Sequence, residues 1–183
     1  MKQLLYAILF SGCMSLTSSA QVSMYGEDII SCSGQQFFLM EDTGLLYAVA
    51  VKGDISKTAE NNNITINGFE ITPGFKEAES NSNTATDELN TLIAINSEQA
   101  TANKIPGSTV ESQFRHTPNG KPLLLIWSDI KGMPVSANLV FGNRVLTLST
   151  IVKAKDIEKA RQLLQEIMDT AVTVSKKEDL CKK

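Results

Sequence analysis

The fold of this chain is decided by residues 110–152, which read VESQFRHTPNGKPLLLIWSDIKGMPVSANLVFGNRVLTLSTIV. Turn signals at residues 117–120, 131–134 and 142–143 divide this stretch into four strand-like runs. In residues 135–141 apolar and polar side chains alternate with a period of two, which is typical of a strand with two unlike faces. Because short turns join antiparallel neighbours, the stretch predicts a four-stranded antiparallel meander.

The run Leu123–Trp127 is apolar on both faces of its strand. Such a run predicts a strand that is covered on both sides. Trp127, the single tryptophan, is therefore expected in the core, with a platform for a stacked ligand as the alternative.

A last helix is predicted from about Asp156, a plausible N-cap, to about Val172. Apolar residues recur at helical spacing on one of its faces. They are Ile157, Ala160, Leu164, Ile167, Met168 and Ala171. A helix with one apolar face needs an element to cover, so we expect it to pack on the meander. The tail beyond it is expected in solvent, apart from Cys181.

The first half predicts a hairpin of residues 36–40 and 45–51, turning at Asp42-Thr43-Gly44. Residues 21–31 are interpreted as a lead-in, and the polar residues 53–63 as a loop. Residues 64–71 favour a short strand, or a hairpin turning at Asn67-Gly68, and Pro73-Gly74 is expected to end it. A mid-chain helix is expected from about Thr86 to residue 104.

These elements predict the α+β class. We expect an antiparallel sheet, made of the C-terminal four-stranded meander and the N-terminal hairpin, covered by the mid-chain helix and the C-terminal amphipathic helix. The length favours one domain, spanning residues 21–183.

Composition narrows the class of protein. Of the 183 residues, 42% are hydrophobic and 20% are charged, which excludes a disordered chain. The net charge of −3 argues against a nucleic-acid binder. No segment is long and apolar enough to be a transmembrane helix.

Residues 1–20 have the pattern of a secretory signal peptide. Lys2 precedes a short apolar run, and Ser18-Ser19-Ala20 supplies the small residues of a cleavage site. The domain is therefore expected outside the cytoplasm, in the periplasm or the medium. One alternative remains, because Phe10-Ser11-Gly12-Cys13 resembles a bacterial lipobox, in which Cys13 would carry a lipid anchor to the outer envelope.

Two cysteines remain in the mature chain, Cys32 and Cys181. A pair in an exported protein predicts a disulfide, and the alternative is two unpaired thiols. Neither cysteine lies in a CxxC motif, so a redox role is not expected.

The order of elements in the second half resembles the PsbP-like family of α/β/α sandwich domains. The resemblance is carried by residues 119–123 before the covered strand, residues 141–148 at the second hairpin, and the helix of residues 157–171. It covers about half of the chain and includes no unique motif; in the first half Pro73-Gly74-Phe75 is the nearest substitute for the family's entry segment. The resemblance implies a non-enzymatic binding or accessory protein, and some similar exported domains act as immunity proteins against secreted toxins.

Catalytic motifs are weak in this sequence. Asp42-Thr43-Gly44 matches the triplet of aspartic proteases, but that chemistry needs two carboxylates, so a hairpin turn is the preferred interpretation. His116 is the only histidine, which argues against a metal site or a serine triad and favours an exposed position at the end of a hairpin. No motif for a cofactor is present.

One cluster of candidate binding residues follows from the topology. Alternate turns of a meander lie at the same end of the sheet, so the turns at 117–120 and 142–143 should be neighbours. This would bring Arg115, His116, Lys121 and Arg144 to one rim. A cationic rim on an acidic protein suits an acidic ligand or partner, or protects the sheet edge.

The best hypothesis is an exported, non-catalytic binding or accessory domain for a protein or small-ligand partner. The alternatives are a lipid-anchored envelope protein of the toxin-immunity type, and a hydrolase using Asp42 or His116.

Overall fold

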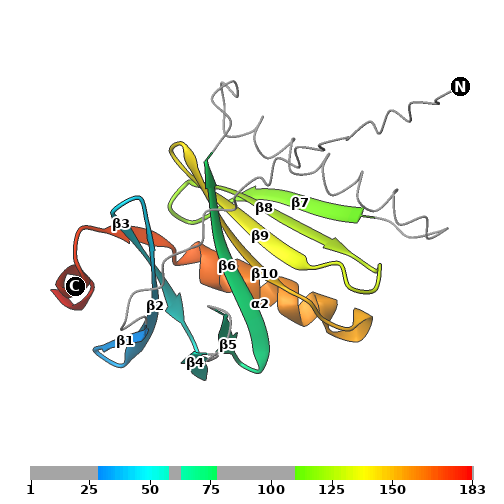
Figure 1. Ribbon diagram of the computed structural model, residues 1–183, viewed down its shortest axis with the longest axis horizontal. Helices are drawn as coiled ribbons and strands as arrows, with labels where there is room; N and C mark the ends of the chain where they lie inside the picture. Colours follow the sequence, from blue (N-terminus) through cyan, green and yellow to red (C-terminus); the bar gives the residue numbers. More distant parts are fainter. Residues whose placement is uncertain (1–28, 58–62, 78–109, 183) are drawn as a thin grey trace, which may run out of the picture.

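A computed structural model describes residues 29–57, 63–77 and 110–182 of the chain (Figure 1). The described residues form two antiparallel sheets and the helix α2 (Ile157–Asp169). The predicted α+β class is therefore confirmed. The expected leader, Cys13 and the expected mid-chain helix at residues 86–104 lie outside the described residues.

The larger sheet has the strand order β4-β5-β6-β10-β9-β8-β7. Its strands are β4 (Ile55–Lys57), β5 (Ile64–Ile66), β6 (Phe69–Glu77), β7 (Val110–His116), β8 (Pro122–Ser128), β9 (Val135–Phe141) and β10 (Arg144–Thr150). The predicted meander β7–β10 is confirmed, as is the hairpin turn at Asn67-Gly68. Because β10 also pairs with β6, it joins the two halves of the chain in one sheet.

The smaller sheet has the order β1-β2-β3-β11. Its strands are β1 (Ile29–Cys32), β2 (Gln35–Asp42), β3 (Leu45–Val51) and β11 (Val172–Val174). The predicted hairpin β2–β3 is confirmed, and it turns at Thr43 and Gly44, whose φ angles are 51° and 78°. Two left-handed residues are what a tight turn between twisted strands requires. The hairpin thus belongs to a sheet of its own, beside the sheet of the meander.

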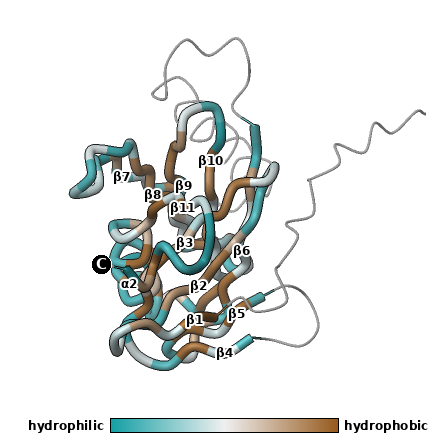
Figure 2. Tube along the Cα trace, turned by 90° about the vertical axis from the view of Figure 1, so that its left-hand side faces the viewer, coloured by the Kyte–Doolittle hydropathy of each residue, from teal (hydrophilic) through white to brown (hydrophobic). Residues whose placement is uncertain are grey.

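Helix α2 joins the two sheets through its apolar face. Its buried residues Ala160, Leu164, Ile167 and Met168 are four of the six predicted to lie on that face. The helix packs against β8, β9 and β10 of the larger sheet and against β3 of the smaller one. One hydrophobic core therefore contains side chains of both sheets and of the helix, and Figure 2 shows the hydropathy of these elements along the chain.

The larger sheet has a second buried face. Leu124, Ile126, Val140 and Val145 form a separate cluster there. Asn138 is buried too, and its amide donates to the carbonyl of Leu124 at 3.3 Å. The covered strand predicted at residues 123–127 is therefore confirmed.

Pro73-Gly74 does not end a strand, so that prediction is wrong. β6 continues through both residues to Glu77. β5 pairs only with Phe69–Ile71 of β6, and β10 pairs with residues 72–77. Among the described residues, Pro73 thus has a neighbouring strand, β10, on one side only. Proline is tolerated at such a position, because its missing N–H can lie on the unpaired side.

Three other boundaries were also predicted wrongly. The expected loop at residues 53–63 contains β4, and the expected lead-in contains β1. The helix ends at Asp169 instead of Val172, because Val172 starts β11, which pairs with β3. The tail forms a 3-10 helix, η2 (Lys177–Lys182), none of whose residues is buried, which agrees with the expected position in solvent.

Candidate functional site

The four residues of the predicted rim lie at one end of the larger sheet. His116 ends β7 directly after Arg115, Lys121 precedes β8, and Arg144 begins β10. The ammonium group of Lys121 lies 4.8 Å from the ring centre of Phe141, the last residue of β9. The meander thus brings these strand ends together, while a binding role for the four residues stays a prediction.

Arg115 and His116 project to opposite faces of the sheet, because successive side chains of a strand alternate. Arg115 is paired with Leu123, a residue of the core below α2, and its Nη1 donates to Asp169 Oδ2 at 3.0 Å. His116 lies edge-on to Phe114, with ring centres 5.2 Å apart. The rim therefore does not form one continuous cationic patch.

Arg144 and Asp42 form a two-point ion pair between the sheets. Arg144 Nε donates to Asp42 Oδ2 at 2.5 Å, and Nη2 donates to Oδ1 at 2.6 Å. The side chains of Arg144 and Asp42 are 12% and 10% exposed to solvent, respectively. The planar guanidinium fits a carboxylate in this fork geometry, which fixes orientation as well as charge.

Three aromatic rings pack beside this ion pair. Tyr47 lies 4.6 Å from Phe75 and 5.2 Å from Phe141 between ring centres, and it is almost fully buried. Burial raises the pKa of the Tyr47 phenol above its ordinary value, the Asp42 carboxylate raises it further, and Arg144 opposes the rise.

The geometry gives the two catalytic candidates other roles. Asp42-Thr43-Gly44 is the hairpin turn that was preferred on sequence grounds, and both carboxylate oxygens of Asp42 accept from Arg144. His116 is exposed at a strand end, as expected. Within the described residues, no group of three or more His, Cys, Asp or Glu side chains could hold a metal ion.

Trp127 is half-buried rather than fully buried, so the expectation of a core position is only partly met. Its ring packs against the core, and its indole N–H donates to Glu111 Oε2 at 3.1 Å. The Arg161 guanidinium of α2 lies 4.5 Å from the ring centre and covers it.

A groove runs along the end of α2 and the smaller sheet, and sequence reasoning missed it. One pocket of about 250 Å³ is lined by Lys52, Leu163, Glu166 and Asp169 together with Gln35, Ala50 and Thr170. A second pocket of about 420 Å³ shares the last three of these residues. We call the two adjoining pockets the seam groove.

The second pocket of the seam groove is the more apolar one. Phe37, Val172, Val174 and Leu180 line it, beside Cys32. Ser33, Thr173 and Asp179 line it as well. The first pocket is lined by one lysine and two carboxylates beside Leu163. Both pockets therefore combine apolar walls with a few polar groups, as small-molecule sites commonly do.

Thr170 and Gln35 fix the floor of the seam groove. The backbone N–H of Ala50 donates to Thr170 Oγ1 at 2.8 Å, and that hydroxyl lies 2.7 Å from the carbonyl oxygen of Ile167. Gln35 Nε2 donates to the carbonyl of Val51 at 2.8 Å. Single polar residues at these positions carry no periodic signal, which is why the sequence did not point to them.

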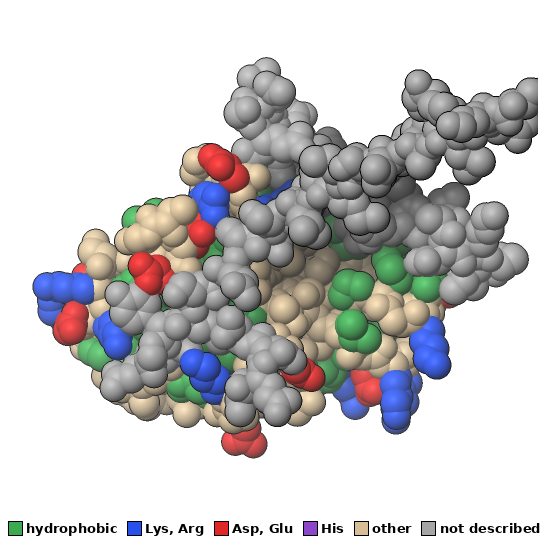
Figure 3. Space-filling view, viewed as in Figure 1, with side chains coloured by type: hydrophobic (Ala, Val, Ile, Leu, Met, Phe, Trp, Pro, Cys, Tyr) green, Lys and Arg blue, Asp and Glu red, His purple; other side chains and the backbone are tan. Residues whose placement is uncertain are grey.

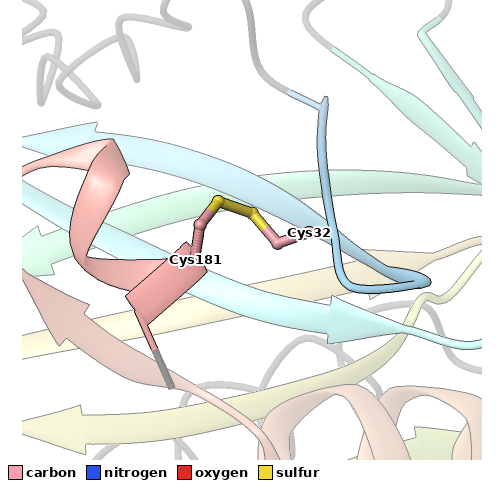
Figure 4. The surroundings of a disulfide bond; sticks show 2 residues. All are labelled: Cys32 and Cys181. Atoms are coloured by element: carbon pink, nitrogen blue, oxygen red, sulfur yellow. A yellow bond between two sulfur atoms is a disulfide. The ribbon is translucent and has the colours of Figure 1, made fainter.

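The disulfide Cys32–Cys181 closes one end of the seam groove, and it confirms the predicted pairing (Figure 4). It joins the end of β1 to η2 across a separation of 149 residues, with the two Cα atoms 5.2 Å apart. The chain after α2 is thereby held against β3 and becomes a wall of the groove.

A third pocket, of about 500 Å³, lies at the opposite end of the larger sheet. It is lined by the loop of residues 128–132 and by Ile151–Ala154 with Ile157. Ile151 is 68% exposed there. Figure 3 shows basic and acidic side chains of the described residues interspersed around the periphery of one face.

None of the helices in the described part of the chain has the length and apolar character needed to cross a membrane. Comparison with family models and with curated proteins found no significant match. Among solved structures, the chain is similar to the solution structure of cyanobacterial PsbP (CyanoP) from Synechocystis sp. PCC 6803. The match has a TM-score of 0.46 and 8% sequence identity, and covers 90% of this chain and 99% of that one. It agrees with the PsbP-like resemblance of the sequence and concerns the fold alone.

Proposed function

We propose that this protein is an exported, non-catalytic binding domain that holds a small amphipathic molecule in the seam groove. The observation that carries the proposal is the pair of adjoining pockets, of about 250 and 420 Å³, that share Gln35, Ala50 and Thr170. Known ligand pockets span ~300–1,000 Å³ and combine apolar walls with a few polar groups. The seam groove has this size and this composition.

The proposed ligand has an apolar body and a cationic or hydrogen-bond-donating end. The apolar body would lie along Val172 and Leu180 in the larger pocket. The polar end would lie in the smaller pocket, which Glu166, Asp169 and Lys52 line. Asp169 Oδ2 accepts from Arg115, but Asp169 Oδ1 is buried without a hydrogen-bond partner among the described residues, which favours a donor over an anion.

Two observations support export and a non-catalytic role. A disulfide between distant cysteines persists in oxidising compartments, in agreement with the leader pattern of residues 1–20. Both carboxylate oxygens of Asp42 accept hydrogen bonds from Arg144, which occupies the atoms that a catalytic carboxylate would present to a substrate. Replacing Asp42 and His116 separately tests the hydrolase alternative, because loss of an activity with retained fold would support catalysis.

The ligand site is tested with N-phenyl-1-naphthylamine, a fluorescent probe with an apolar body and one N–H donor. We expect its emission to rise on binding, and Ala50→Phe to abolish the rise by filling the part that both pockets share. Ala154→Phe is the matched control, because Ala154 lines the pocket at the opposite end of the sheet. Loss of binding in the Ala154 variant alone would refute the seam groove.

Export is tested by mass spectrometry of the mature N-terminus. A chain beginning at Gln21 supports the cleaved leader, and a diacylated Cys13 supports the lipid-anchored alternative. A retained Met1 in a cytosolic protein would refute export.

A further inference from the structure

The larger sheet leaves one long edge strand. Among the described residues each sheet has two edge strands. Three of these four edge strands are short: β1 has four residues, and β11 and β4 have three each. β7 has seven residues and pairs there with β8 only. Its sequence, VESQFRH, has no proline or lysine, and its two charged residues, Glu111 and Arg115, have opposite signs, so they can attract a second copy instead of repelling it.

The outward backbone groups of β7 can be identified from its hairpin with β8. Thr117 N–H donates to the carbonyl of Lys121 at 2.9 Å, so Thr117 forms a hydrogen-bonded pair with its opposite residue. Such pairs alternate along an antiparallel ladder, so Arg115, Gln113 and Glu111 also bond toward β8. The backbone groups of Val110, Ser112, Phe114 and His116 consequently point away from β8.

The side chains of this edge are exposed, and one of them is a large apolar group. Glu111, Ser112 and Gln113 are exposed, and Phe114 keeps 47% of its surface in contact with solvent. A Phe side chain on an unpaired edge gains from burial by an added strand.

We propose that β7 pairs antiparallel with β7 of a second copy of this chain, about a two-fold axis at Gln113. In this register Ser112 lies opposite Phe114 of the other copy, and Val110 lies opposite His116. The backbone groups of all four residues point away from β8. The pairs Ser112–Phe114 and Val110–His116 can therefore each exchange two hydrogen bonds between the copies. Each pair occurs twice, because the two-fold axis relates the two copies.

Charge favours this register. Glu111 lies opposite Arg115 of the other copy, and the axis creates this contact twice. Within each chain Glu111 Oε2 accepts from Trp127 and Arg115 Nη1 donates to Asp169, so the contact between copies would use Glu111 Oε1 and the other guanidinium N–H groups. With the axis at Ser112 or Phe114, Glu111 or Arg115 lies opposite the neutral Gln113 and the Glu111–Arg115 attraction is lost. A shift that places the axis at Glu111 or at Arg115 sets like charges face to face, which is destabilising. In the proposed register the two Phe114 side chains are also diagonal neighbours, within reach of one another. The contact involves about seven residues per chain, against ~20–30 in a standard interface, so dimers should dissociate on dilution.

Cysteine scanning tests the register in the protein with its Cys32–Cys181 disulfide formed. Gln113 faces its own copy in a non-hydrogen-bonded pair, where side chains approach most closely. Gln113→Cys should therefore cross-link into a covalent dimer under mild oxidation. Ser112→Cys is the matched control, because it faces Phe114, and it should cross-link much less. Equal cross-linking of both variants, or of neither, overturns the proposal.

Charge reversal tests the pairing independently. Glu111→Arg and Arg115→Glu should each be monomeric alone by sedimentation equilibrium at a concentration where the wild-type protein dimerises. Mixed together, the two variants should form a heterodimer, because every opposed pair then has opposite charges. Lys131→Glu, at the other end of the sheet, has the same charge change as Arg115→Glu and should dimerise normally. Asp169→Asn removes the Arg115 ion pair within the chain without changing β7, and it should dimerise normally too. A wild-type protein with the mass of one chain at every concentration, or variants that fail to pair when mixed, would overturn it.

Discussion

Arg144 and Asp42, which are 102 residues apart in the chain, hold the two sheets together by a bidentate ion pair. Asp42 ends β2 of the smaller sheet, and Arg144 begins β10 of the larger one. The pair lies beside the Tyr47, Phe75 and Phe141 rings, so charge and packing act at the same junction. Two residues that sequence reasoning assigned to separate candidate sites are thus partners.

The ion pair predicts a loss of stability when one member is removed. Arg144→Met leaves the Asp42 carboxylate, 10% exposed, without its partner. We expect a decrease of about 2–3 kcal/mol in the free energy of unfolding, below the ~3–5 kcal/mol of fully buried pairs. Urea unfolding measures the change. The double variant Asp42→Asn/Arg144→Met should lose less than the sum of the two single losses, and additive losses would contradict a direct pair. Lys182→Met, which breaks an exposed pair with Asp179, should change stability little.

Tyr47 predicts a dependence of stability on alkaline pH. Its pKa in the folded protein is raised, so the folded state holds the phenolic proton more tightly than the unfolded state. Stability is therefore retained below the ordinary pKa of 10.0 and falls as the pH rises above it. Tyr47→Phe should be less sensitive to pH in this range. The measurement is the difference in urea midpoint between the two proteins across the alkaline range, and parallel curves would be the contrary result.

The disulfide predicts a large and non-additive effect of cysteine replacement. It closes a loop with a sequence separation of 149 residues, so its loss should lower stability by about 2–4 kcal/mol. Cys32→Ser, Cys181→Ser and the double variant should unfold at the same urea concentration, because each lacks the same bond. Reductant should lower the midpoint of the wild-type protein only. A difference between the single variants would show that one cysteine has a separate role.

Thr170 predicts that its hydroxyl fixes the end of α2 to β3. Thr170→Val keeps the shape but leaves the N–H of Ala50 without its acceptor at 2.8 Å. We expect a loss of about 1 kcal/mol, because the N–H of Ala50 is only partly buried and lies at the groove, where water can replace the lost acceptor. Thr173→Val, at an exposed position of β11, is the control and should be close to neutral. Thermal or urea unfolding of both variants measures the contrast.

Regular stretches of the sequence predicted the structure well. The meander β7–β10 and the hairpin β2–β3 followed from alternation and from turn residues, and the buried face of α2 followed from helical spacing. The same reasoning placed the strand ends of the rim together, since turns alternate between the two ends of a meander. In each case the sequence pattern involves residues that are close together in the chain, so it can be recognised without the structure.

Other features depended on contacts between segments that are distant in the sequence. Pro73 stands within β6 because β5 stops before it, and Val172 joins a strand because β3 offers an edge. The groove is formed by α2, β3 and the tail, three segments without a common local pattern.

The order of strands in the meander, the apolar side of the helix and the pairing of Cys32 with Cys181 were thus determined by the sequence alone. The division into two sheets, the partner of Arg144 and the seam groove were decided by the tertiary structure. Hydrophobic periodicity specifies which face of an element is buried, but it leaves the opposing element unspecified. Contacts between distant segments are selected only when all these faces pack around one core.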